Sequence, residues 1–124
     1  MVALELFAVL AATGDAFDGN ATTSTVLPLG TWTDITGVSV TIAANKTVLL
    51  ADVEGQQNQT GWLRVLIDST VVMYRRMAQA NYPFIWHPRV PLKIASSGSS
   101  RTLKLQLYAD NNGEGTGRIA GITF

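Results

Sequence analysis

One stretch of the sequence, from Gly30 to Gly55, constrains the fold more than any other. Apolar and polar residues alternate between positions 37 and 42, so that one face of this segment would carry Val38, Val40 and Ile42. A period of two is typical of a half-buried β-strand. The segment 46–53 repeats the pattern with more apolar residues, after a short polar turn at 43–45. The stretch therefore predicts consecutive strands and an all-β protein, and it contains no residue set for catalysis.

Turn-forming residues divide the rest of the chain in the same way. The clearest alternation lies at 101–109, where Leu103, Leu105 and Leu107 are expected to face the core. Three prolines in 82–94 lack the N–H that a central strand needs, so this segment is predicted to be an edge strand or a bulged connection. Further strands are expected at 25–29, 31–35, 62–67, 71–76 and 118–124, and loops at 14–20, 55–61, 96–100 and 110–117. About eight to ten short antiparallel strands with regular turns predict a β-sandwich or barrel.

The size and charge of the chain limit its partners. Its 124 residues suit a single domain, 1–124, and nine Lys and Arg balance nine Asp and Glu. A neutral chain with 15% charged residues lacks the basic surface that nucleic acid or an anionic membrane requires. A near-zero net charge with 47% hydrophobic residues favours self-association. The absence of cysteine excludes disulfides, thiolate zinc sites and cysteine nucleophiles.

The N-terminal segment, residues 1 to about 17, is rich in Ala, Leu and Val. It lacks the basic start of a signal peptide, and Glu5 interrupts its apolar run, so we expect a strand that the mature protein keeps. A short helix is the alternative, because Ala and Leu dominate the segment. Residues 1–24 are interpreted as an N-terminal strand or arm. Leu4, Leu6 and Phe7 are predicted to contact a neighbouring protomer or another protein by strand addition.

Candidate catalytic and metal sites are few. His87 is the only histidine, and a triad or zinc site needs further partners, so an edge or interface role is the simpler interpretation of 86–89. Within these residues, Trp86 and Arg89 are predicted partner contacts. The loops 110–114 and 15–18 carry oxygen ligands of the kind that Ca²⁺ takes, but 110–114 fails the EF-hand spacing. A polar hairpin loop is the alternative, so neither a metal nor another cofactor is predicted.

Aromatic and arginine side chains could form a binding surface. Six aromatic residues could stack on sugars or could pack in the core and interfaces, and these are Trp32, Trp62, Trp86, Tyr74, Tyr82 and Tyr108. We favour packing, because no aromatic cluster is visible in the sequence. Arg75 and Arg76 would point to opposite faces of a strand. Arg64 and Arg89 are candidates for pairing between chains, with Asp52, Glu54 or Asp68 as their partners. Asn20, Asn45 and Asn58 begin glycosylation sequons, which we interpret as chance residues in turns.

Four segments together resemble a known kind of module. They are TVLPLGTWTDITGVSVTI (25–42), KTVLLADVEG (46–55), GWLRVLIDST (61–70) and RTLKLQLYADNNGEGTGRIAGITF (101–124). They resemble jelly-roll modules, similar to C1q and tumour necrosis factor, in bacteriophage capsid decoration, head-fibre and tail-fibre proteins. The resemblance covers about residues 25–124. It implies a jelly roll, a homotrimer and a role in the virion, and it supplies no catalytic residue.

The sequence thus predicts a non-enzymatic structural protein. The resemblance implies a homotrimeric decoration or cement protein of a tailed phage, which assembles in the bacterial cytoplasm and binds the major capsid protein on the capsid surface. The alternative is a tail-fibre or receptor-binding tip that recognises a surface glycan through exposed Trp or Tyr. A soluble ligand of the C1q type is a third possibility, and the missing signal peptide counts against it.

Overall fold

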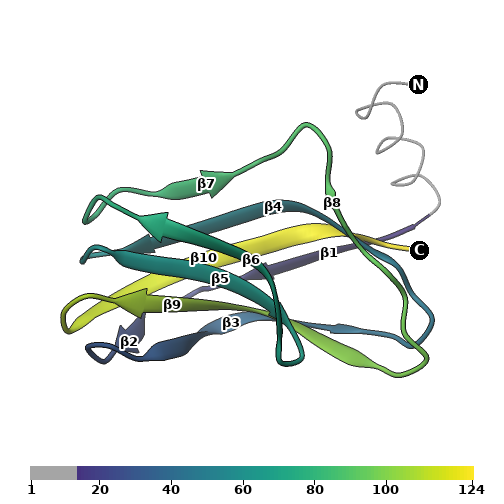
Figure 1. Ribbon diagram of the computed structural model, residues 1–124, viewed down its shortest axis with the longest axis horizontal. Coiled ribbons are helices and arrows are strands. Elements are labelled where there is room, and N and C mark those ends of the chain that lie inside the picture. Colours follow the sequence, from purple (N-terminus) through teal and green to yellow (C-terminus); the bar gives the residue numbers. More distant parts are fainter. Residues whose placement is uncertain (1–13) are drawn as a thin grey trace.

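The structure, a computed structural model, describes residues 14–124, so the predicted contacts of Leu4, Leu6 and Phe7 lie outside the described residues. The described chain forms antiparallel strands in two sheets (Figure 1). Their bounds are β1 (Asp15–Asn20), β2 (Thr25–Leu27), β3 (Trp32–Ile42), β4 (Val48–Gln57), β5 (Gly61–Ile67), β6 (Thr70–Met77), β7 (Phe84–Trp86), β8 (Leu92–Ile94), β9 (Arg101–Ala109) and β10 (Gly113–Thr123). No helix of this part of the chain is long and apolar enough to cross a membrane.

The strand order is that of a jelly roll. One sheet has the order β1-β10-β4-β7, with β2 also paired to β10 and β8 also paired to β4. The other sheet has the order β3-β9-β5-β6. β1 and β2 together form one edge of the first sheet, and β7 and β8 together form its other edge. If each of these pairs is counted as one strand, every connection crosses from one sheet to the other except the β5–β6 hairpin. The predicted antiparallel jelly-roll sandwich is confirmed.

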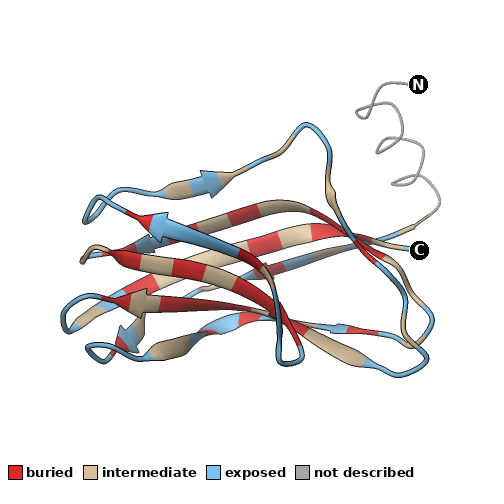
Figure 2. Cartoon of the chain, viewed as in Figure 1, coloured by how far each residue is buried: buried red, intermediate tan, exposed pale blue. Residues whose placement is uncertain are grey.

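The core lies between the sheets, where Figure 2 shows buried residues alternating mainly with residues of intermediate burial along the central strands. Leu103, Leu105 and Leu107 are fully buried, as the alternation in 101–109 predicts. Leu105 and Leu107 face inward-pointing glycines of the opposite sheet. A Cβ on Gly55 would lie 2.5 Å from Cδ1 of Leu63 and 3.4 Å from Cδ2 of Leu107. Glycine at this position therefore lets leucine side chains of one sheet reach the backbone of the other.

Several predicted boundaries are wrong. Residues 14–20, predicted to be a loop, contain β1, which pairs with β10 from Asp15↔Thr123 to Asn20↔Arg118. Its Gly and Asp residues suit an edge strand whose side chains are mostly exposed. The predicted loops 55–61 and 110–117 shrink to short turns, because β4 extends to Gln57 and β10 begins at Gly113. The segments 31–35 and 37–42 form one strand, with a register shift between Asp34 and Ser39.

The proline-rich edge behaves as predicted. β7 pairs with β4 at Val53, Glu54 and Gly55, and β8 pairs with it at Val48, Leu49 and Leu50. Residues 87–91, which include Pro88 and Pro91, leave the sheet between the two. An interrupted edge strand with prolines offers little backbone for uncontrolled pairing with another chain.

Candidate functional site

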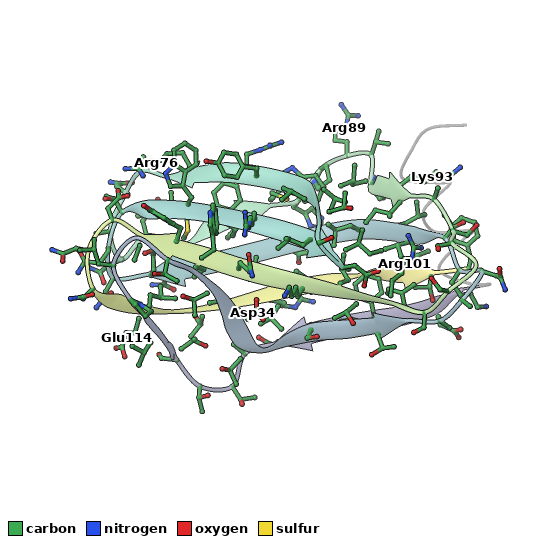
Figure 3. The ribbon with its side chains drawn as sticks, turned by 60° about the horizontal axis from the view of Figure 1, so that its bottom comes forward. Asp34, Arg76, Arg89, Lys93, Arg101 and Glu114 are labelled. Atoms are coloured by element: carbon green, nitrogen blue, oxygen red, sulfur yellow. The ribbon has the colours of Figure 1, made fainter. Side chains whose placement is uncertain are left out.

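The outer surface of the β3-β9-β5-β6 sheet gathers aromatic and charged side chains from all four strands. The strand register forms a first row of Trp32, Tyr108, Trp62 and Arg76. A second row, two residues along each strand, consists of Asp34, Gln106, Arg64 and Tyr74. We call these eight residues the aromatic–arginine face. Asp34 and Arg76 mark its opposite edges on β3 and β6, and both are labelled in Figure 3.

The rings of this face pack on one another. Trp62 stacks on Tyr74 with ring centroids 4.8 Å apart and an interplanar angle of 15°. Trp32 makes tilted contacts with Tyr108 at 5.4 Å and with Tyr74 at 5.9 Å. The guanidinium of Arg64 lies 4.1 Å above the Trp32 ring. Much of the ring surface is therefore covered by neighbours within the chain.

Hydrogen bonds order the polar members of the face. The Nε2 of Gln106 donates to Asp34 at 2.6 Å, and its Oε1 accepts from the Nε of Arg64 at 2.7 Å. The hydrogen bond from Gln106 lowers the pKa of Asp34, with help from Lys104 at 3.2 Å. Asp34 is thus held as an acceptor-only carboxylate, which fixes the orientation of the Gln106 amide.

At the end of the face, Arg76 binds Asp110. Its Nη2 lies 2.8 Å from Oδ2 of Asp110, and its guanidinium lies 5.2 Å from the Trp62 ring centroid. The hydrogen bond from Arg76, followed by that from Thr60, lowers the pKa of Asp110. Arg75 lies on the same strand but instead donates to the carbonyl of Tyr74. The two adjacent arginines therefore do not form one patch, as their positions in a strand predict.

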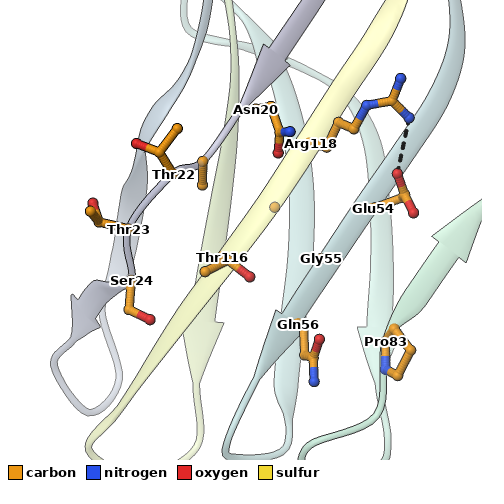
Figure 4. A pocket seen from close by; sticks show the side chains of 12 residues that line it. Asn20, Thr22, Thr23, Ser24, Glu54, Gly55, Gln56, Pro83, Thr116 and Arg118 are labelled. Carbon is orange, nitrogen blue, oxygen red and sulfur yellow. Dashed lines mark hydrogen bonds and ion pairs between the residues drawn. The ribbon is translucent and has the colours of Figure 1, made fainter.

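A groove of about 480 Å³ crosses the outer surface of the other sheet (Figure 4). It lies where the β1–β2 edge is interrupted, and β4 and β10 form its floor. Its side chains are mainly amides, hydroxyls and ions. They include Asn20, Thr22, Ser24, Gln56, Thr116 and Arg118.

Arg118 joins three carboxylates at one end of this groove. It binds Asp18 at 3.0 Å, Asp52 at 2.6 Å and Glu54 at 3.1 Å. The hydrogen bonds that Arg118 donates to Asp18 and Glu54 raise the pKa of its guanidinium, which therefore stays charged. Asp52 and Glu54 are thus paired within the chain, whereas the sequence suggested them as partners of Arg64 or Arg89 between chains.

The predicted partner contacts lie on the β7–β8 edge. Trp86 packs partly against the core, whereas Arg89 is exposed and points away from the body of the molecule (Figure 3). His87 is exposed beside them, and no side chain among residues 14–124 hydrogen-bonds to it. Within those residues, no group of three or more His, Asp or Glu is placed to hold a metal ion.

The oxygen-rich loops serve as turns. Asp110 binds Arg76 and Thr60, and Asn112 accepts a hydrogen bond from the backbone N–H of Leu29. Asn58 accepts one from the N–H of Glu114. Within 110–114, these contacts occupy Oδ2 of Asp110 and Oδ1 of Asn112, and they favour the hairpin-loop interpretation of this segment.

The aromatic–arginine face was missed by sequence reasoning, which found no aromatic cluster. Its signal is nonetheless present, because each strand carries an aromatic or polar pair at positions i and i+2, opposite its core residues. What the sequence lacks is the order of the strands. Only the β5–β6 hairpin is local, whereas β3 and β9 join this sheet from distant parts of the chain.

No family model and no curated protein matches this sequence. The fold, however, resembles solved structures from viral particles. A chain in the crystal structure of the T13 particle of IBDV superposes with a TM-score of 0.52 and 14% sequence identity. The match covers 90% of this chain and 31% of that chain, so the present chain spans about a third of its length.

Two further structures, from the Gx and Gt strains of infectious bursal disease virus, match less well. Their TM-scores are 0.47 and 0.44, at 16% and 14% identity. The matches cover 90% and 89% of this chain, and 32% of each of those chains. At these identities the likeness is one of fold.

Proposed function

We propose that this protein is a non-enzymatic structural component of a virion. The observation that carries the proposal is the jelly-roll order of its two sheets, which aligns over 90% of the chain with a chain of an icosahedral viral particle. Residues 14–124 form two extended surfaces, the aromatic–arginine face and the polar groove, and they contain no arrangement of nucleophile, base and histidine. Such a molecule acts through assembly and contact.

The more specific form of the proposal is a homotrimeric decoration protein on the capsid of a tailed phage. The resemblance of 25–124 to phage jelly-roll modules supports it, as does the neutral, apolar composition. Light scattering at several concentrations should give three times the chain mass. Deleting residues 2–12 should abolish the trimer or its binding to capsids, whereas unchanged mass and occupancy would rule out a role for this segment.

The virion role has its own test. Particles purified from the source of this sequence should contain the chain in a fixed ratio to the coat protein, as measured by quantitative mass spectrometry. Chain recovered only in the unassembled fraction would contradict the proposal. The ratio also separates a decoration protein, present at lattice stoichiometry, from a tail-fibre protein present in a few copies.

Glycan recognition is a second candidate, and the polar groove favours it. Amides, hydroxyls and Glu54 line this groove, and such groups bind sugar hydroxyls, while the aromatic rings are largely covered by one another. A glycan array distinguishes the two surfaces. Binding that is lost in Gln56→Ala but kept in Trp62→Ala would place a sugar in the groove, and the reverse would place it on the rings. No binding to any glycan would remove this candidate.

A further inference from the structure

One arginine of the aromatic–arginine face is held in place from two sides. Gln106 binds the Nε of Arg64 at 2.7 Å, and the ring of Trp32 lies 4.1 Å below its guanidinium. Gln106 is itself 9% exposed and is oriented by Asp34, which binds Lys104 in turn. This chain of contacts fixes the plane of the guanidinium before any ligand arrives.

The two terminal nitrogens of Arg64 have no acceptor among residues 14–124, since only its Nε–H is hydrogen-bonded there. By contrast, Arg76 and Arg118 bind carboxylates of the same chain through their terminal nitrogens. A guanidinium has five N–H donors, and those on the terminal nitrogens form a planar fork that matches both oxygens of a carboxylate. Arg64 therefore presents a preoriented site for a carboxylate.

Aromatic rings surround this site. Tyr74 is opposite Arg64 on β6 and is 47% exposed, while Trp62 and Tyr108 lie in the adjacent row. Rings around a charged pair exclude water and strengthen its hydrogen bonds. Trp, Tyr and Arg are also the residues enriched at the energetically dominant centres of protein interfaces.

We propose that Arg64 receives the side-chain carboxylate of an Asp or Glu on a partner protein, with the partner's surface lying over Trp32 and Tyr74. Two observations favour a protein over a saccharide. The ring faces that a sugar would need are occupied by Tyr74, Arg64 and Arg76, and the site lies on a sheet surface rather than in the polar groove. Charge complementarity selects an acidic residue, because Arg76 of the face already binds Asp110 and the neighbouring Lys104 already binds Asp34.

This inference rests on the proposed function in one respect, since it identifies the face through which the virion protein would contact another protein. Its test is independent of the particle. A library of short random peptides is selected against the full-length protein, and the enriched peptides are measured by fluorescence anisotropy. We expect them to contain Asp or Glu beside apolar residues, and a Glu-to-Gln or Asp-to-Asn change in the peptide should weaken binding at least about tenfold.

Three variants locate the site. Arg64→Gln and Arg64→Lys should each weaken peptide binding at least about tenfold, the latter because an ammonium keeps the charge but loses the fork. Arg75→Gln removes the same charge from β6, the strand paired with that of Arg64, and should bind as the parent does. Urea unfolding shows whether each variant is folded. If Arg64→Gln does not fold, Arg64→Lys still tests the site.

Each remaining outcome overturns the proposal. Peptides without acidic residues, no enriched peptides, or binding retained in both Arg64 variants would show that Arg64 is not a carboxylate site for proteins. Sialylated or glucuronate-containing oligosaccharides are assayed in parallel, and Arg64-dependent binding of these alone would assign the fork to an acidic sugar. A failed peptide selection would contradict the carboxylate site but not the virion role. Absence of the chain from particles would contradict the virion role but not the carboxylate site.

Discussion

The packing of Gly55 against Leu63 offers a sharp test of how closely the two sheets approach. Gly55 lies on β4 and points inward. The three atoms nearest to a Cβ added to it are all side-chain atoms, namely Cδ1 of Leu63 at 2.5 Å, Cδ2 of Leu107 at 3.4 Å and Cε of Met77 at 3.7 Å. Its φ is not among the positive values of the chain, so alanine fits the backbone. The cost of Gly55→Ala is therefore steric, and shortening Leu63 should remove it.

The expected free energies follow from this geometry. Overpacking by one methyl group should cost about 1–3 kcal/mol in Gly55→Ala, partly offset by about 0.4–1 kcal/mol because alanine restricts the unfolded chain. Leu63 is fully buried, so Leu63→Ala should cost about 3–5 kcal/mol. In the double variant the Cδ1 of Leu63 is absent, so the methyl group added at position 55 meets no clash there and fills part of the cavity that Leu63→Ala leaves. The double variant should therefore be more stable than Leu63→Ala alone, with a coupling free energy of about 1–3 kcal/mol.

The free energy of unfolding of the parent, the two single variants and the double variant is measured by urea titration, followed by tryptophan fluorescence and circular dichroism. All four are measured at one protomer concentration, because self-association would shift the midpoint. Gly98→Ala is the matched control, since nothing lies within 4 Å of a Cβ at that position. It should change stability by less than about 0.5 kcal/mol in this setting. If the free-energy costs of the two single variants add up to that of the double variant within about 0.5 kcal/mol, the reasoning is refuted, because additivity means that the two positions are not in contact.

Three other expectations follow from the outer surfaces. Arg118→Gln leaves the carboxylates of Asp18, Asp52 and Glu54 without their shared cation. The variant should lose about 1–3 kcal/mol of stability at low salt and recover part of this at high salt, as measured by urea titration. The lowered pKa of Asp110 adds stability that is complete above about pH 4 and is lost as the pH falls through the folded-state value. Asp110→Asn should therefore reduce the difference in Tm between neutral and acidic solution, and an unchanged difference would contradict the role of its bond to Arg76. Alanine variants of Trp62 and Tyr74 should show a coupling of about 0.5–1.5 kcal/mol in a double-mutant cycle, and independence of the two would exclude their stacking as a source of stability.

The sequence predicts the core better than the edges of the sheets, for a physical reason. Burial on one face imposes a period of two, so Leu103, Leu105 and Leu107 could be assigned to the core from alternation alone. An edge strand has no such requirement. β1 keeps Gly and Asp residues that suit a loop equally well, and only its pairing with β10 shows it to be a strand.

The candidate site could be predicted only in part, because its rows join residues that are far apart in the sequence. Arg64 and Tyr74 belong to one hairpin, so their proximity follows from a turn at 68–69. Gln106 reaches Arg64 only because β9 lies between β3 and β5. That order depends on how the whole chain crosses between sheets, which is decided by packing and not by any local pattern.

The two outer surfaces differ in how their charges are satisfied, and this difference decides what each can do. On the β1-β10-β4-β7 sheet, Arg118 binds Asp18, Asp52 and Glu54, so no cation in this cluster is left to attract an acidic partner. On the opposite sheet, Arg64 is ordered by Gln106 and Trp32 but keeps its terminal donors. A protein that binds copies of itself through one sheet could therefore bind a different protein through the other, because the surfaces lie on opposite sides of the sandwich (Figure 1). Loss of peptide binding in Arg64→Lys without any change in oligomeric mass would show that the two contacts are separate.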